Sequence, residues 1–370
     1  MTPKQRFLTA VAGGTPDAVA VSPLIHARFA HRLISAYGWR DVYRVHRLIG
    51  TVHFRGPLGV GFDFEWPEGW GDDDSLELGE DGRVIRQHTV RTPFGDLSST
   101  YVNNLIPGDP LVGKYVVYPV KEPEQWTVYQ RLTEKLTELA VRPDLEGVRQ
   151  AHRVMGEEGV PSVGVGSVFG RLGNQRGMAE LLLDLYDHPS LIASVYDTTW
   201  QYQERVLQAF LDSPSEVCFY DICWATGARM GPKLFEKWVG PEIRRAVELV
   251  HRRPGKYVGF YTLGRIRELL PVMVDTGVDF IETFEPNEGD ITLAEAKRLY
   301  GKRTCLMGNF DCLVLARGSR EEARQETLRC LQEGMDGGGY VLVTADEVPA
   351  DARLDNLKVM AETADRHGHY

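Results

Sequence analysis

Short apolar runs alternate with longer amphipathic segments through the second half of the chain, from Pro161 onward. Six runs have the length of a β-strand: Ser162–Gly166, Val217–Asp221, Tyr257–Thr262, Phe280–Phe284, Thr304–Gly308 and Tyr340–Thr344. The longer segments space their apolar residues three and four apart, as amphipathic helices do: Gly177–Asp187, Pro189–Leu211, Pro232–His251, Leu263–Thr276, Thr292–Tyr300 and Arg320–Gly334. This alternation predicts βα units around a parallel sheet that is buried on both faces.

Two further strands are expected in the first part of the chain, at Ala18–Ser22 and Val60–Glu65. With the six later runs they give eight strand-and-helix repeats, the number that closes a TIM-type barrel. A length of 370 residues lies within the range that such a barrel occupies as one domain. The sequence therefore predicts an α/β fold, with a single (β/α)8 TIM-type barrel domain over residues 1–370.

The stretch from Leu76 to Val120, near the N-terminal third, interrupts this rhythm. Turn signals at residues 80–82 and 92–95 separate stretches of alternating polarity such as Val84–Val90 and Tyr115–Val120. This pattern is typical of antiparallel strands joined by short turns. We therefore expect residues 76–120 to form an antiparallel β insertion in an early βα loop of the barrel.

The composition restricts the binding partners and the cellular compartment that we expect. The chain has 42 Lys and Arg residues against 52 Asp and Glu residues, a net charge of −10 with no basic run, so nucleic acid is not expected as a partner. Five cysteines without a CxxC pair favour a reducing compartment over a disulfide framework. No apolar run approaches the roughly 18 residues that a membrane span needs. We expect a cytoplasmic protein without a membrane partner.

The residues that leave the C-terminal ends of barrel strands are where such folds place their chemistry, and they define the candidate catalytic residues. Asp221 and Glu282 each close an apolar run, and either carboxylate could act as a general acid or base. Tyr261 could donate a hydrogen bond to a developing anion, or serve only in packing. Asp346 follows the last strand. These four residues are the predicted catalytic set.

The same rule gives candidates for substrate contacts and metal ligands. His26, after the presumed first strand, reads either as a ligand or acid/base group, or as a surface histidine at a helix start. Cys223 reads either as a metal ligand or as a small core residue. The predicted substrate-binding residues are His26, Arg28, Phe169, Glu285, Asn309 and Asp311. The predicted metal ligands are Cys223, Glu282 and His26.

A polar turn follows the run Thr304–Gly308, and the chain then resumes with the helix-like residues Leu313–Leu315. A turn that leaves the C-terminal end of a barrel strand lies at the mouth of the barrel. Asn309 and Asp311 are therefore expected to face the mouth.

Motifs along nearly the whole chain resemble those of the uroporphyrinogen decarboxylase-like superfamily. The most specific are the Gly-Asn-x-Asp turn at residues 308–311 and the Gly-Gly-Gly-Tyr strand at residues 337–340. Residues 91–97 (RTPFGDL) and 118–126 (YPVKEPEQW) are similar to the β insertion of methyltransferase-type members. The resemblance implies a (β/α)8 barrel, in agreement with the hydrophobic pattern, and a homodimer as in some members.

The chain departs from the decarboxylase itself where the carboxylates of the substrate would bind. The decarboxylase has Arg-Gln-Ala-Gly-Arg after its first strand, whereas residues 24–28 here read Leu-Ile-His-Ala-Arg. It also has a His where this chain has Asp346. An acidic mouth would repel a substrate with many carboxylates by about 1 kcal/mol for each close pair. Uroporphyrinogen decarboxylation is therefore not expected.

The zinc set of the family's methyltransferases is also missing. Those members present His-x-Cys after the strand that here reads VGFYTLG, and a second Cys in a late loop; Tyr261, Leu263 and Asp346 occupy these positions. Zinc would need another combination, such as Cys223 with Glu282 or His26.

The resemblance implies methyl transfer from a small O-, N- or S-methylated compound to a corrinoid or similar carrier. Zinc and a corrinoid are the cofactor candidates, with no cofactor as the alternative, and a corrinoid protein is the candidate partner. Two other functions stay open: a decarboxylase or other lyase of a small carboxylated substrate, and a non-catalytic small-molecule binding homologue.

Overall fold

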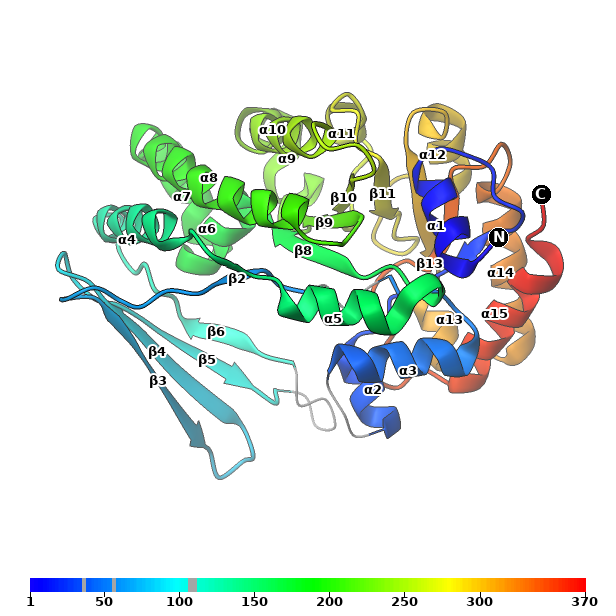
Figure 1. The fold of residues 1–370 in the computed structure, drawn as a ribbon, viewed down its shortest axis with the longest axis horizontal. Helices are drawn as coiled ribbons and strands as arrows, with labels where there is room; N and C mark the ends of the chain where they lie inside the picture. The colour runs from blue at the N-terminus through cyan, green and yellow to red at the C-terminus, as the bar shows by residue number, and fades with distance from the viewer. Residues whose placement is uncertain (35–37, 55–57, 106–111) are drawn as a thin grey trace. The chain divides into compact units, whose positions relative to one another are not determined.

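The computed structural model describes residues 1–34, 38–54, 58–105 and 112–370, and within them it shows an α/β fold built on a seven-stranded parallel sheet (Figure 1). The strand order is β1-β13-β12-β11-β10-β9-β8. Its strands are β1 (Ala20–Val21), β8 (Ser162–Gly166), β9 (Val217–Asp221), β10 (Tyr257–Tyr261), β11 (Phe280–Thr283), β12 (Cys305–Phe310) and β13 (Tyr340–Thr344).

Residues 52–54 and Leu58 occupy the eighth place in the ring, and among the described residues they form isolated bridges. Val52 N–H donates to Val21 O of β1 at 2.9 Å, and Leu58 N–H donates to Ser162 O of β8 at 3.0 Å. The predicted (β/α)8 TIM-type barrel is confirmed. The second strand was placed wrongly at Val60–Glu65, because residues 61–62 form β2, which pairs with β7 (Pro143–Asp144) in a separate antiparallel ribbon.

Contacts divide the described chain into two compact units. The first comprises residues 1–60, 145–166 and 210–370, and the second comprises residues 61–144 and 167–209. The prediction of one domain over residues 1–370 stays a prediction.

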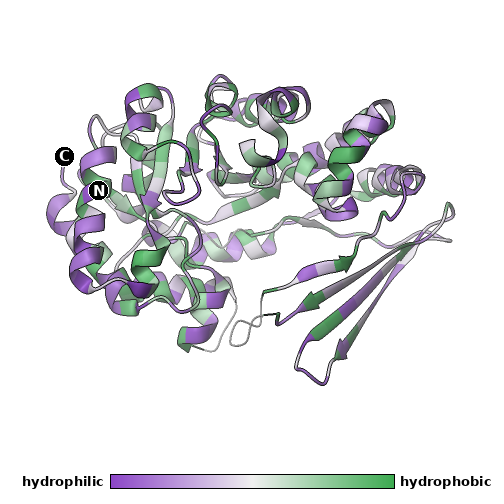
Figure 2. Ribbon diagram, turned by 180° about the vertical axis from the view of Figure 1, so that it is seen from behind, coloured by the Kyte–Doolittle hydropathy of each residue, from purple (hydrophilic) through white to green (hydrophobic). Residues whose placement is uncertain are grey.

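In the first unit, helices cover the outer face of the parallel strands (Figures 1 and 2). These helices are α1 (Pro3–Val11), α2 (Ala27–Ile34), α3 (Trp39–Ile49), α5 (Glu146–Met155), α9 (Gly227–Trp238), α10 (Gly240–His251), α11 (Leu270–Val274), α12 (Leu293–Tyr300), α13 (Cys312–Arg317), α14 (Arg320–Gly334) and α15 (Leu354–His367). The predicted helix Pro232–His251 is divided into α9 and α10, with Gly231 in a left-handed conformation inside α9.

The barrel interior is apolar at its N-terminal end and is closed there by α1. Phe7 of α1 is fully buried and packs on Phe54, with ring centroids 4.7 Å apart. Phe7 belongs to one buried cluster with Val217, Phe280 and other residues from the first positions of the strands. Since this end is filled and covered, the polar strand residues are left at the opposite, C-terminal end.

The second unit contains the antiparallel insertion. Its four-stranded sheet follows the order β3-β4-β5-β6 and begins at Gly71, before the predicted start at Leu76; residues 106–111 of the prediction lie outside the described chain. The elements of this unit are β2 (Gly61–Phe62), β3 (Gly71–Leu78), β4 (Val84–Arg91), β5 (Leu97–Asn103), β6 (Lys114–Val117), β7, α4 (Gln125–Leu139), α6 (Val168–Arg176), α7 (Met178–Asp187) and α8 (Pro189–Asp212).

A buried carboxylate joins three helices of this unit. Asp184 of α7 accepts hydrogen bonds from Trp126 Nε1 of α4 at 2.7 Å and from Arg176 Nε of α6 at 2.9 Å. Both donors satisfy a charge that would otherwise be costly to bury. Among the described residues, no helix is both long and apolar enough to cross a bilayer.

One histidine of α3, in the first unit, is fully buried. His46 Nδ1 lies 2.8 Å from Thr51 Oγ1, and its ring centroid lies 5.0 Å from that of His53. Burial, and to a lesser extent His53, holds the pKa of His46 well below its usual value. His46 is therefore neutral near pH 7.

We expect acid to destabilise the protein through His46. Below about pH 6.5 the unfolded chain binds a proton that folded His46 excludes, so its contribution is complete above that pH and declines as the pH falls toward the folded-state pKa. The decline can reach about 1.4 kcal/mol per pH unit. Urea denaturation across this pH range should show a flatter profile for His46→Gln. His367→Gln, on exposed α15, is the control and should keep the wild-type slope; an unchanged slope in His46→Gln would contradict the assignment.

Candidate active site

Three of the four predicted catalytic residues share one level of the barrel. Tyr261 of β10 is in register with Asp221 of β9 on one side and with Glu282 of β11 on the other. Side chains alternate along a strand, and Phe219, Phe280 and Tyr261 belong to the interior core cluster. Asp221 and Glu282 therefore point into the same interior layer as Tyr261. Glu282 is 1% exposed, so this carboxylate is almost entirely removed from solvent.

The fourth residue is in direct contact with this layer. Tyr261 Oη donates a hydrogen bond to Asp346 Oδ1 at 2.6 Å, which joins the end of β10 to the loop after β13. The same Asp346 oxygen accepts from the Glu347 backbone N–H at 2.7 Å. A phenol and a carboxylate at this short distance can pass a proton between them. The structure thus brings together Asp221, Tyr261, Glu282 and Asp346; their catalytic roles stay predictions.

Two thiols lie beside these acids. The Cys223 backbone N–H donates to Asp221 Oδ1 at 2.9 Å, and Cys312 Sγ donates to the Asp346 carbonyl oxygen at 3.3 Å. Burial, reinforced by the charge of Asp221, raises the pKa of the Cys223 thiol, and burial raises the pKa of Cys312 to about 12. Both groups are thiols near pH 7, so neither is suited to act as a free thiolate nucleophile.

His26 and Arg28 lie next to this set, in agreement with their position after the first strand. His26 Nε2 is 3.8 Å from Glu347 Oε1, and Arg28 Nη1 is 3.7 Å from Glu347 Oε2. The loop is held in place because Val348 N–H donates to Leu24 O at 2.8 Å. Both predicted substrate-binding residues therefore flank the Tyr261–Asp346 pair through the neighbouring Glu347.

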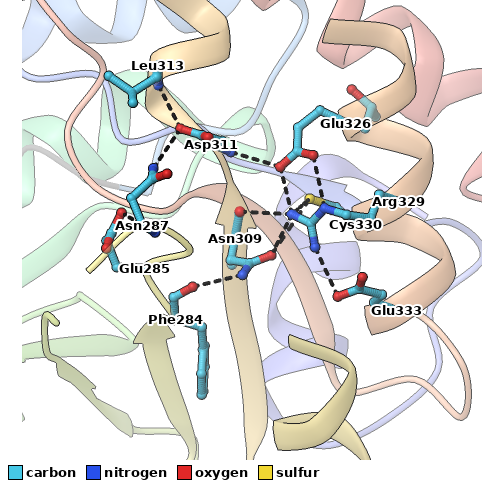
Figure 3. Close-up of polar contacts among 12 residues, drawn as sticks. Phe284, Glu285, Asn287, Asn309, Asp311, Leu313, Glu326, Arg329, Cys330 and Glu333 are labelled. Carbon is cyan, nitrogen blue, oxygen red and sulfur yellow. Dashed lines mark hydrogen bonds and ion pairs between the residues drawn. The ribbon is translucent and has the colours of Figure 1, made fainter. Parts of the chain in front are cut away.

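Asn309 does not face the mouth, and that prediction was wrong. It is 2% exposed, and its side chain bridges β11 and α14: Nδ2 donates to Phe284 O at 2.8 Å, and Oδ1 accepts from Arg329 Nη2 at 2.9 Å (Figure 3). The buried amide needs partners for both its donor and its acceptor, and the guanidinium of α14 supplies one of them. Asn309 therefore holds the barrel wall to its helix layer.

Asp311 and Glu285 are used mainly to order loops. Asp311 Oδ1 accepts from Leu313 N–H at 2.8 Å as the N-cap of α13, and from Asn287 Nδ2 at 3.1 Å (Figure 3). Glu285 accepts from the backbone N–H of Asn287 at 3.0 Å. The restart of the chain as helix immediately after the turn is thus explained by a capping carboxylate. Phe169 is fully buried in α6, in the second unit.

The predicted metal ligands do not converge. Only one set of three ligand atoms within 4.8 Å of one another is found among the described residues, formed by Asp72, Asp74 and His88 on exposed strands of the second unit. Cys223, Glu282 and His26 form no such set. A zinc ion bound by these residues stays a prediction.

The comparisons with known proteins agree with this architecture. A family model described as uroporphyrinogen decarboxylase (URO-D) matches residues 113–367. The chain belongs to the URO-D family. Curated uroporphyrinogen decarboxylases from Neisseria meningitidis serogroups C and A are 25% identical over 181 residues, 48% of this chain and 49% of theirs. The matched region therefore spans about half the length of these relatives.

A solved structure of a methyltransferase from Methanosarcina mazei has the same fold as this URO-D family member. It is 15% identical and covers 99% of both chains, with a TM-score of 0.67. The family resemblance predicted from the motifs is confirmed.

Sequence reasoning missed several residues around the site. Arg229 and Arg265 each follow a strand end by a few residues, and this position was the available signal. Nothing in the sequence singled out Arg329, because an arginine on a helix rich in charged residues is usually exposed to solvent. In the structure Arg329 binds Asn309, Glu326 and Glu333. Burial by itself lowers the pKa of its guanidinium, but the acidic partners Glu326 and Glu333 raise this pKa, and the net shift is upward.

We expect Arg329→Met to destabilise the fold by on the order of 2 kcal/mol, because it leaves Asn309, Glu326 and Glu333 without their shared donor. Arg324→Met is the matched control on the same helix, since within the described parts of the chain Arg324 pairs with exposed Glu321 alone. Urea denaturation of both variants measures the difference. Equal midpoints for the two variants would refute the structural role of the Arg329–Asn309 contact.

Proposed function

We propose that this URO-D family protein transfers a methyl group from a small O-, N- or S-methylated compound to a corrinoid or similar carrier. The observation that carries the proposal is the Tyr261–Asp346 hydrogen bond of 2.6 Å at the end of β10. A methylated heteroatom is a poor leaving group unless it is protonated as its bond to carbon breaks. A phenol backed by a carboxyl group supplies that proton.

The methyl–heteroatom bond breaks, its electron pair remains on the heteroatom, and the heteroatom takes the Tyr261 Oη proton. Asp346 Oδ1, which accepts the Tyr261 Oη–H in the absence of substrate, holds this hydroxyl in place, and the phenolate left behind takes a proton from solvent after the demethylated product leaves. A reduced corrinoid, as the acceptor, would supply the electron pair for the new bond to the methyl carbon.

The carboxylates in the same layer as Tyr261 favour a small substrate. Asp221 and Glu282 stand in register on either side of Tyr261, and Glu282 is buried. A substrate with many carboxylates would be repelled here, by about 1 kcal/mol for each close pair at high effective dielectric. A neutral or singly charged methyl donor avoids most of this cost.

A carboxy-lyase acting on a small acid is the second candidate. The curated relatives carry the name uroporphyrinogen decarboxylase, and the same Tyr261 hydroxyl could protonate the carbon that loses carbon dioxide. Carbon dioxide release without a demethylated product would select this function over methyl transfer.

We expect Tyr261→Phe to lower kcat for methyl transfer by roughly 100-fold, because the acid is lost while the ring remains. Asp346→Asn should also lower kcat, because it removes the carboxylate that holds the Tyr261 hydroxyl in place. Tyr257→Phe, at the opposite end of β10, is the control and should retain activity. The assay follows demethylated product and consumption of added cob(I)alamin with a panel of methyl donors. No transfer from any donor by the wild-type protein would argue against the proposal.

A further inference from the structure

A cavity of about 730 Å³ opens beside the candidate active site, among the loops that follow β9, β10 and β11. Cys223, Trp224, Arg229, Arg265 and Glu288 are among the residues that line it. Cys223 connects the cavity to the catalytic layer, because its backbone N–H donates to Asp221 Oδ1 and its side chain packs against the interior cluster that contains Tyr261. A ligand in this cavity could therefore reach the Tyr261–Asp346 pair.

Two arginines line this cavity. Arg229 lies over the Trp224 ring, 5.4 Å from its centroid, and Nη1 makes a 3.4 Å contact to the Trp224 carbonyl oxygen. The Arg265 side chain has no hydrogen-bond or ion-pair partner within the part of the chain that the structure describes, whereas nearby Arg267 binds Glu295. Both groups thus keep unused N–H donors, in a protein whose net charge is −10.

The charges of the residues that line the cavity indicate which class of ligand it can bind. Arg229 and Arg265 contribute two positive charges and Glu288 one negative charge, and the other lining residues are uncharged, which leaves one positive charge. One carboxylate balances this charge, and its two oxygens match the fork of a guanidinium. A phosphate dianion would exceed it and would also be repelled by Glu288.

We propose that this cavity binds the single carboxylate of a small substrate through Arg229 and Arg265. The inference rests on the proposed function and deepens it: the methyl donor carries one carboxylate at a distance from its methylated heteroatom. The carboxylate then fixes the donor, while the methylated end extends past Cys223 toward Tyr261. Binding energy spent on a remote, unreactive group in this way orients the reacting end.

The loops around the cavity are held in position before any ligand binds. Arg265 O accepts from Gly227 N–H at 2.8 Å, which ties the loop after β10 to the start of α9. Asn287 is tied to the N-cap residue Asp311 at 3.1 Å (Figure 3). A cavity with fixed walls loses less conformational entropy when it is filled.

Isothermal titration calorimetry with benzoate and benzamide tests the proposal on the full chain, because these probes have the same shape but differ in charge. We expect saturable binding of benzoate, much weaker binding of benzamide, and a roughly tenfold loss of benzoate affinity in Arg265→Gln and in Arg229→Gln. Arg252→Gln, which removes an exposed positive charge outside this cavity, should bind benzoate like the wild type.

Absence of benzoate binding in the millimolar range, equal binding of the two probes, or equal losses in Arg252→Gln and Arg265→Gln would overturn the proposal. Tighter binding of inorganic phosphate than of benzoate would overturn the carboxylate assignment. The titration contains no methyl donor or acceptor, so its outcome does not depend on catalysis. Arginine-dependent benzoate binding without methyl transfer would leave the subsite standing and refute only the proposed reaction.

Discussion

The parallel register of β9, β10 and β11 is the constraint on which the candidate site depends. Hydrogen bonds between neighbouring strands align Asp221, Tyr261 and Glu282, and strand alternation turns all three toward the barrel interior. A shift of one residue in any strand would send its polar group into the helix layer. The apolar residues earlier in the same strands, with α1 packed beneath them, oppose such a shift because each would lose its place in the core.

This constraint explains why much of the fold could be predicted from sequence. Strands of a parallel sheet are buried on both faces, so runs such as Val217–Asp221 and Tyr340–Thr344 stand out against amphipathic helices, and both were placed with the observed bounds. The strand end then locates the candidate residues without any knowledge of tertiary contacts. That rule brought Asp221, Tyr261, Glu282 and Asp346 to one place, although it says nothing about what each residue does.

The residues that were predicted wrongly, or not at all, show what the strand-end rule cannot predict. Asn309 was expected at the mouth because its position in the chain was known, but its orientation depends on Arg329, which is distant in sequence and comes from another element. The second barrel strand was misplaced because the described residues at its true position form isolated bridges, and the sequence there lacks the long apolar run of the later strands. Arg229 and Arg265 were overlooked because a cavity is formed jointly by three loops, and no single loop reveals it.

The distribution of charge at the mouth bears on which substrates this URO-D family protein can bind. Carboxylates are the main charged groups near the Tyr261–Asp346 pair. The arginines at this end of the barrel differ in whether an acidic side chain already lies close to them. Arg28 lies near Glu347, whereas the Arg265 side chain has no hydrogen-bond or ion-pair partner among the residues that the structure describes. A mouth of this kind can favour one carboxylate at the cavity while it rejects several at the catalytic layer. Because the cationic cavity is separate from the acidic layer, the site would select substrates by the number of carboxylates they carry. Members of the family could then share a fold without sharing a substrate.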